Sequence, residues 1–138
     1  MEYTFTIDGK NYNRTHVMPS LNNYIAACGK SPIVGSRMKQ DYMKIANWQI
    51  RSQLHRLAIR RPIKIHYVIY EVNRKRDFMN VLSFADKVIE DSLQACGVIP
   101  NDNQEWVRGV SVDFKIDYKH PRIEVTLEEI CCTEKVQQ

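Results

Sequence analysis

An amphipathic helix over residues 81–95 is the feature that most constrains the fold of this 138-residue chain. Its apolar residues recur at the i, i+3, i+4, i+7 spacing that places them on one helix face, and Gly97 supplies a stop signal. These residues are Val81, Phe84, Ala85, Val88, Ile89 and Leu93. The apolar, β-branched run over residues 63–72 predicts a central strand just before the helix. Together the two elements predict a helix packed on a sheet.

The remaining elements follow from weaker patterns. Alternating apolar residues predict further strands over residues 3–7, 107–118 and 122–130. A second helix is expected from a cap at Ser36 to about Ala58, because Pro62 ends its periodic pattern. Residues 9–36 are rich in Gly, Pro, Asn and Ser and predict a long loop. The resulting order, β-α-β-α-β-β, predicts an α+β domain with helices packed on one mixed β-sheet.

Length and composition indicate a single domain over residues 1–130 and a frayed tail over 131–138. The sequence has neither the ~20 consecutive apolar residues of a membrane span nor the pattern of a secretory signal, so we expect a cytoplasmic protein without a membrane partner. The four cysteines form no Cys-x-x-Cys pair, and the four histidines add no zinc-ligand spacing. These patterns argue against a disulfide scaffold and a structural zinc site.

Basic residues are concentrated in one part of the chain. Residues 51–76 hold eight of the 20 Lys and Arg side chains and a single acid, Glu71. Because the whole chain has a net charge of +4, the rest of it is net negative. A basic block of this kind is suited to phosphate contacts, as in nucleic-acid binding. A solvated helix face followed by a basic turn explains the same pattern equally well.

Polar residues gather at the edge of the apolar face of the 81–95 helix. On a helical wheel Asn80, Lys87 and Asp91 fall within roughly 40° of one another. Lys87 and Asp91 are spaced i, i+4, which a surface ion pair also explains. Asp77 follows the basic triplet Arg74–Arg76 directly. It is therefore either part of a solvated turn or a Mg²⁺ ligand beside phosphate contacts.

These residues resemble the RusA family of Holliday junction resolvases, which is common in phages and prophages. The similar stretches are Arg76-Asp77-Phe78-Met79-Asn80, then Lys87-x-x-x-Asp91-x-Leu93, then Gly97-Val98-Ile99-Pro100-Asn101-Asp102-Asn103. In that family an Asp-x-Asp-Asn motif opens a helix that carries Lys-x-x-x-Asp-x-Leu, and a Gly and an acidic turn follow. Residues 19–24 are similar to an early Pro-Ser-Asn-Asn segment of the family.

The resemblance implies a RusA-like fold and Mg²⁺-dependent hydrolysis of a phosphodiester in branched DNA, with Mn²⁺ able to substitute. It implies a homodimer that presents two sites to a four-way junction. Asp77 and Asp102 match the catalytic metal ligands, and Lys87 matches the active-site lysine. The DNA contacts are expected from Asn80 and from the basic side chains Arg56, Arg60, Arg61, Arg74, Lys75 and Arg76.

Met79 departs from the family pattern, because it stands where a second metal-binding aspartate is expected. A thioether is a poor ligand for Mg²⁺. Either Asp91 or Glu71 substitutes, or metal affinity is weak, or the protein binds junctions without cutting them. A plain interaction domain, with the basic block as solvated surface, is the remaining alternative.

The helix also separates the two expected metal ligands. About 15 residues at ~1.5 Å rise put its ends ~22 Å apart, with Asp77 before one end and Asp102 beyond the other. They can share a metal if residues 97–102 double back along the helix, or if each chain of a two-fold dimer supplies one of them. Otherwise Asp91 and Asp102 form a separate cluster at the C-terminal end.

Overall fold

The computed structural model describes residues 1–9 and 17–130. Its elements are β1 (Glu2–Asp8), α1 (Leu21–Lys30), α2 (Pro32–Leu54), β2 (Ile63–Glu71), α3 (Phe78–Ala95), β3 (Val107–Ile116) and β4 (Arg122–Glu129). The predicted α+β class is confirmed. The predicted order is wrong by one element, because two helices separate β1 from β2 and the order is β-α-α-β-α-β-β. The expected tail, 131–138, lies outside the described residues.

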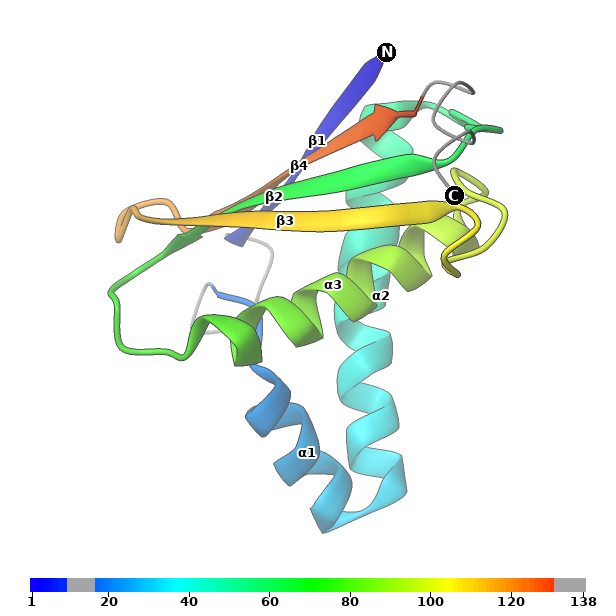
Figure 1. The fold of residues 1–138 in the computed structure, drawn as a ribbon. Coiled ribbons are helices and arrows are strands. Elements are labelled where there is room, and N and C mark those ends of the chain that lie inside the picture. Colours follow the sequence, from blue (N-terminus) through cyan, green and yellow to red (C-terminus); the bar gives the residue numbers. More distant parts are fainter. Residues whose placement is uncertain (10–16, 131–138) are drawn as a thin grey trace.

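The strands form a mixed sheet in the order β1-β4-β2-β3. β2 and β3 are parallel, joined by the crossover through α3, while β4 is antiparallel to both β1 and β2. Along β2 every second residue, from Ile63 to Glu71, is buried. α2 and α3 cover that face of the sheet, and α1 packs on them farther from it (Figure 1).

The amphipathic helix is confirmed as α3. All six of the apolar residues that define its predicted face are buried in the core. Gly97 has φ +75, the left-handed conformation that suits a residue just after a helix end. The amides of Val98 and Ile99 both donate to the carbonyl oxygen of Leu93, at 2.9 and 3.4 Å, so the chain leaves the helix in a tight turn.

The prediction of a long loop over residues 9–36 is wrong for its later part. α1 occupies Leu21–Lys30, and α2 begins at Pro32 rather than after Ser36. The turn-forming residues act as caps: the Ser20 hydroxyl accepts from the Asn23 amide at 3.3 Å, and Ser31 caps α2 at 3.1 Å from the Val34 amide. Residues 10–16 of the expected loop lie outside the described residues.

The C-terminal end of α2 also differs from the prediction. The helix ends at Leu54, where His55 and Arg56 take positive φ values of 48 and 64. The left-handed turn therefore stops the helix four residues before Ala58. The exposed segment that follows carries Arg56, Arg60 and Arg61 to the end of α3, where the Ile59 amide donates to the Val98 carbonyl at 2.8 Å.

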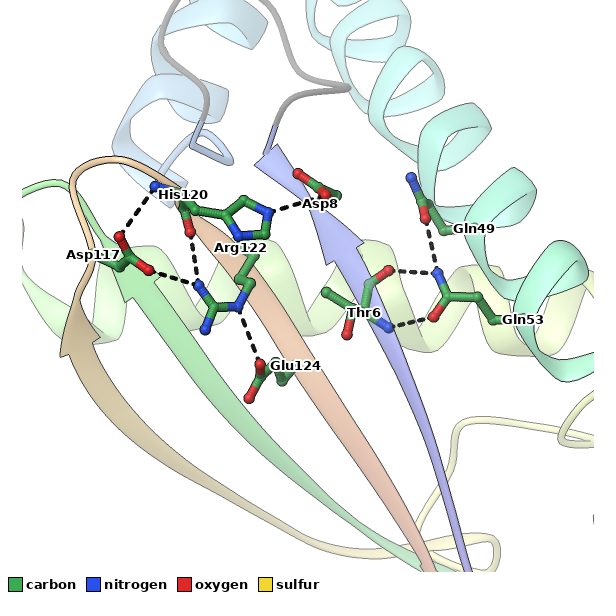
Figure 2. A network of polar contacts seen from close by, with 8 residues as sticks. All are labelled: Thr6, Asp8, Gln49, Gln53, Asp117, His120, Arg122 and Glu124. Atoms are coloured by element: carbon green, nitrogen blue, oxygen red, sulfur yellow. Dashed lines mark hydrogen bonds and ion pairs between the residues drawn. The ribbon is translucent and has the colours of Figure 1, made fainter.

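Side-chain networks fix the sheet at β1 and at the β3–β4 turn (Figure 2). The Gln53 side chain of α2 pairs with the backbone of Thr6: it accepts a hydrogen bond from the Thr6 amide and donates one to the Thr6 carbonyl, at 2.7 Å each. This pairing occupies backbone groups of β1, an edge strand. In the turn Arg122 donates to Asp117 at 2.9 Å and lies 3.7 Å from the centre of the Tyr70 ring. That hydrogen bond lowers the pKa of Asp117.

None of the helices in the described part of the chain is both long and apolar enough to cross a membrane.

Candidate functional site

Asp77 is the N-cap of α3. Its Oδ1 accepts from the Met79 amide at 3.0 Å, and its Oδ2 accepts from the Asn80 side chain at 3.4 Å. A carboxylate in this position also interacts favourably with the positive end of the helix dipole. The carboxylate is exposed, so capping leaves it open to solvent and to a ligand. Met79 is beside it, with 52% of its surface exposed.

The basic triplet before α3 does not act as one group. Arg76 turns inward and forms two hydrogen bonds with Glu71, at 2.8 and 2.9 Å, and a third with the Met18 carbonyl at 2.8 Å. Glu71 is only 6% exposed, so this is a largely buried ion pair. Arg74 and Lys75 are exposed in the β2–α3 connection. They, and not Arg76, have the position expected for contacts with DNA.

Lys87 and Asp91 lie together on α3, as their spacing predicts, with Nζ and Oδ2 3.9 Å apart. Asp91 forms a much shorter ion pair of 2.7 Å with Lys39 of α2. The pair ties α2 to α3 and leaves the Asp91 side chain 21% exposed. Lys87 stays 61% exposed. Asp91 therefore links α2 to α3, while the Lys87 side chain remains largely exposed.

Asp102 lies in the α3–β3 connection, beyond the C-terminal end of α3, whereas Asp77 caps the N-terminal end. The 18 residues of α3 span ~27 Å at ~1.5 Å per residue. A single chain therefore does not bring these two carboxylates to one ion. Among the described residues no group of three or more His, Cys, Asp or Glu side chains is arranged to hold a metal.

Asp102 nevertheless lies near acids that the sequence reasoning missed. Glu90 lies one turn after Asp86 on α3, and the negative charges of Asp86, Asp102 and Asp91 all act on its carboxyl group. Tyr67, which is fully buried in β2, donates to Asp86 Oδ1 at 2.6 Å. We call Asp86, Glu90 and Asp102 the acidic cluster. In the sequence, the i, i+4 spacing of Asp86 and Glu90 could have indicated this cluster. Two like charges at that spacing are unfavourable on a helix unless another interaction compensates them.

Burial, followed by the hydrogen bond and negative charge of Asp86, raises the pKa of Glu90 to about 9. Between the ordinary pKa of 4.5 and this value, the folded protein keeps a proton that the unfolded chain has lost. The free energy of unfolding therefore falls as pH rises through this window.

Replacing Glu90 with glutamine should remove that pH dependence. At pH 8 we expect a gain of about 1–2 kcal/mol in the free energy of unfolding, a figure reduced for solvent screening of the partly exposed group. Near pH 4.5 the gain should vanish. Urea unfolding at both pH values measures it. Glu105→Gln, in an exposed turn, is the control, and an equal gain in both variants would contradict burial of the Glu90 carboxyl as the cause.

The basic residues that follow α2 lie at the same end of α3 as Asp102. The backbone bond between Ile59 and Val98 holds the two connections together. Beside it a cavity of about 580 Å³ is lined by Arg51, His55 and Arg56 together with apolar residues and Cys96. Arg60 and Arg61 are exposed farther along the same α2–β2 connection. The arginine-rich segment and the connection that carries Asp102 thus lie at the same end of α3.

A scan of protein-family models finds no match to this chain, and a comparison with curated proteins finds none either. The resemblance to RusA resolvases therefore rests on the motif residues themselves.

Proposed function

We propose that this protein is a metal-dependent endodeoxyribonuclease that resolves branched DNA, above all four-way junctions. The observation that carries the proposal is the position of Asp102. This residue belongs to the motif that resembles RusA resolvases, its charge acts on Glu90 in the acidic cluster, and it lies at the same end of α3 as an arginine-rich segment. Hydrolysis of a phosphodiester needs that combination of charges: carboxylates for a cation, and bases for the flanking phosphates.

The donor atoms at the acidic cluster fit Mg²⁺ or Mn²⁺ in kind, because both ions prefer oxygen ligands. Proteins commonly hold Mg²⁺ through one or two carboxylates, waters and a phosphate of the substrate, so Asp102 with one further carboxylate of the cluster is sufficient. Asp86 could be that ligand, and Glu90 could be only if binding of the ion displaces its proton. When bound, the ion would polarise the scissile phosphate and lower the pKa of an attacking water. Met79 does not fit, and Glu71 and Asp91 are held by Arg76 and Lys39.

The other residues have positioning roles in this proposal. Lys87 reaches solvent from α3 and would stabilise negative charge on the phosphate. Arg56, Arg60 and Arg61 would bind the backbone on one side of the site, and Arg74, Lys75 and Asn80 on the other. Such contacts orient DNA without reading its sequence. A homodimer would place Asp77 of one chain beside Asp102 of the second and offer one site to each of two strands.

The purified protein should cleave a synthetic four-way junction when Mg²⁺ or Mn²⁺ is added, and leave a linear duplex of the same sequence largely intact. Denaturing gels of end-labelled strands measure the cuts. The melting temperature should rise with either ion. Failure to cut any branched substrate with both ions, with the fold intact, would end the nuclease proposal.

A second candidate is a junction-binding protein that cuts weakly or not at all. Met79 favours it, since this residue stands two positions after Asp77, where the family has a metal-binding aspartate. Gel shifts in EDTA separate the two: binding of junctions without cleavage in Mn²⁺ supports this candidate. A lack of DNA binding even at low salt would favour an interaction domain. For the nuclease and the binding protein alike, the cytoplasm is the expected compartment.

A further inference from the structure

The outer face of α2 presents an exposed tryptophan. Trp48 has 62% of its surface exposed and is not part of the core. It lines a hollow of about 440 Å³ together with Lys44, Asn47, Arg51 and Ser52. Large aromatic side chains are usually well buried, and an exposed one between two cations is typical of binding surfaces. The hollow therefore has the elements of a binding site.

Helical geometry aligns these side chains. Lys44, Trp48 and Arg51 are spaced by four and three residues and so follow one face of α2. Along the helix axis, Lys44 lies about 6 Å from Trp48 on its N-terminal side and Arg51 about 4.5 Å on its C-terminal side. The indole therefore has a cation on either side. Arg51 also lines the cavity of about 580 Å³ that continues to Arg56. The two hollows form one track along the helix and past its end.

The track is strongly cationic. Between Asp41 and Glu71 the sequence contains six Lys and Arg residues and no acid. Asp41 lies one turn before Lys44, at the far end of the track, and none of the acids in residues 1–9 and 17–130 lines either hollow. Apart from Trp48, the hollow around it is lined by polar and charged residues. A polyanion that also carries flat apolar rings complements such a surface, whereas an apolar helix or strand of a protein partner does not.

We propose that this face of α2 binds an unpaired nucleic-acid strand, with a base stacked on Trp48 and flanking phosphates bound by Lys44, Arg51 and Arg56. The inference rests on the proposed function and deepens it, because bases near the crossover of a branched substrate are the ones that can leave the stack. Stacking is tolerant of sequence, since every base has a π face. The track thus recognises the opened branch point, and the acidic cluster of α3 and the α3–β3 connection remains a separate site.

The test measures binding of a fluorescent oligo-dT strand in EDTA at several salt concentrations. Trp48→Ala should weaken binding roughly 10-fold, as loss of one stacked base does, and leave the salt dependence unchanged. Trp48→Phe should recover most of the affinity. Lys44→Ala with Arg51→Ala should weaken binding and reduce the slope of log K against log salt by about 1.4. Tyr118→Ala, which removes an equally exposed aromatic residue from the β3–β4 turn, is the control.

Tryptophan fluorescence reports the stacking directly. In a Trp106→Phe background Trp48 is the sole tryptophan, and oligo-dT should quench it. Three results would overturn the inference. The affinity of Trp48→Ala for oligo-dT could be unchanged, the Trp48 fluorescence could stay unquenched, or poly-glutamate, a polyanion without bases, could displace the labelled strand as well as unlabelled oligo-dT does. Cleavage of junctions by a protein that shows any of these results would refute the track and leave the proposed function standing. Trp48-dependent strand binding without cleavage would support the track and refute the nuclease.

Discussion

Replacing Arg76 with alanine should lower the free energy of unfolding by about 3–5 kcal/mol, the largest stability effect expected for any basic residue of the 74–76 triplet. The substitution leaves the Glu71 carboxylate buried without its two hydrogen bonds, and it also removes the donor to the Met18 carbonyl. At a few degrees per kcal/mol, the melting temperature should fall by roughly 10–20 °C. Thermal and urea unfolding measure both quantities.

Two further variants isolate the cause. Lys75→Ala, in the exposed neighbour, should change stability by no more than about 0.5 kcal/mol. The double substitution Glu71→Met with Arg76→Met should be more stable than Arg76→Ala, because it leaves no unpaired carboxylate buried at position 71. Equal losses in Arg76→Ala and Lys75→Ala would show that the ion pair contributes nothing to the fold.

This result also governs how DNA binding must be tested. A triple substitution of Arg74, Lys75 and Arg76 would weaken binding through partial unfolding as well as through lost phosphate contacts. Arg74→Ala with Lys75→Ala keeps the buried ion pair intact. A smaller salt slope in that double variant, measured on a folded protein, would place the β2–α3 connection on the DNA.

The inward turn of Arg76 could have been inferred from the alternation of β2. Glu71 is in phase with Ile63, Ile65, Tyr67 and Ile69, so the pattern that predicts the strand also places this acid on its buried face. A buried carboxylate requires a partner, and a base five residues later is within reach. The triplet itself carries no such information, because three consecutive basic residues look equally exposed in a sequence.

α3 and the sheet were predictable because each buries one complete face, which imposes a strict period on the sequence. α1 was not, since none of its residues is fully buried and its cap is made of Ser and Asn, the residues that also form turns. The acidic cluster depends on where the α3–β3 connection folds, and this is decided by contacts such as that between Ile59 and Val98. No local pattern encodes such a contact.

Replacing Asp77 with asparagine should reduce cleavage of a four-way junction by about 100-fold or more while the protein stays folded. Losing a carboxylate from a metal site removes several kcal/mol of transition-state stabilisation, which corresponds to a factor of this size. Asparagine is as good an N-cap as aspartate, so the hydrogen bond to the Met79 amide survives. Asp77→Ala would also lose the cap, at a cost of about 1 kcal/mol, and is the less informative variant.

If Asp77→Asn cuts as fast as the parent, Asp77 acts only as a helix cap.

If Asp77→Asn is inactive, mixing it with the Asp102→Asn variant tests whether Asp77 and Asp102, at opposite ends of α3, meet in one site across a dimer. Asp77→Asn and Asp102→Asn are each expected to be inactive alone. In a mixed dimer whose sites are shared across the axis, one site carries both substitutions and the other carries neither, so nicking of a single strand should return. Sites built within one chain would give no recovery, because every chain in the mixture carries a lesion. Returned nicking would thus place the metal between two chains, and its absence, with mixed dimers present, would exclude that arrangement.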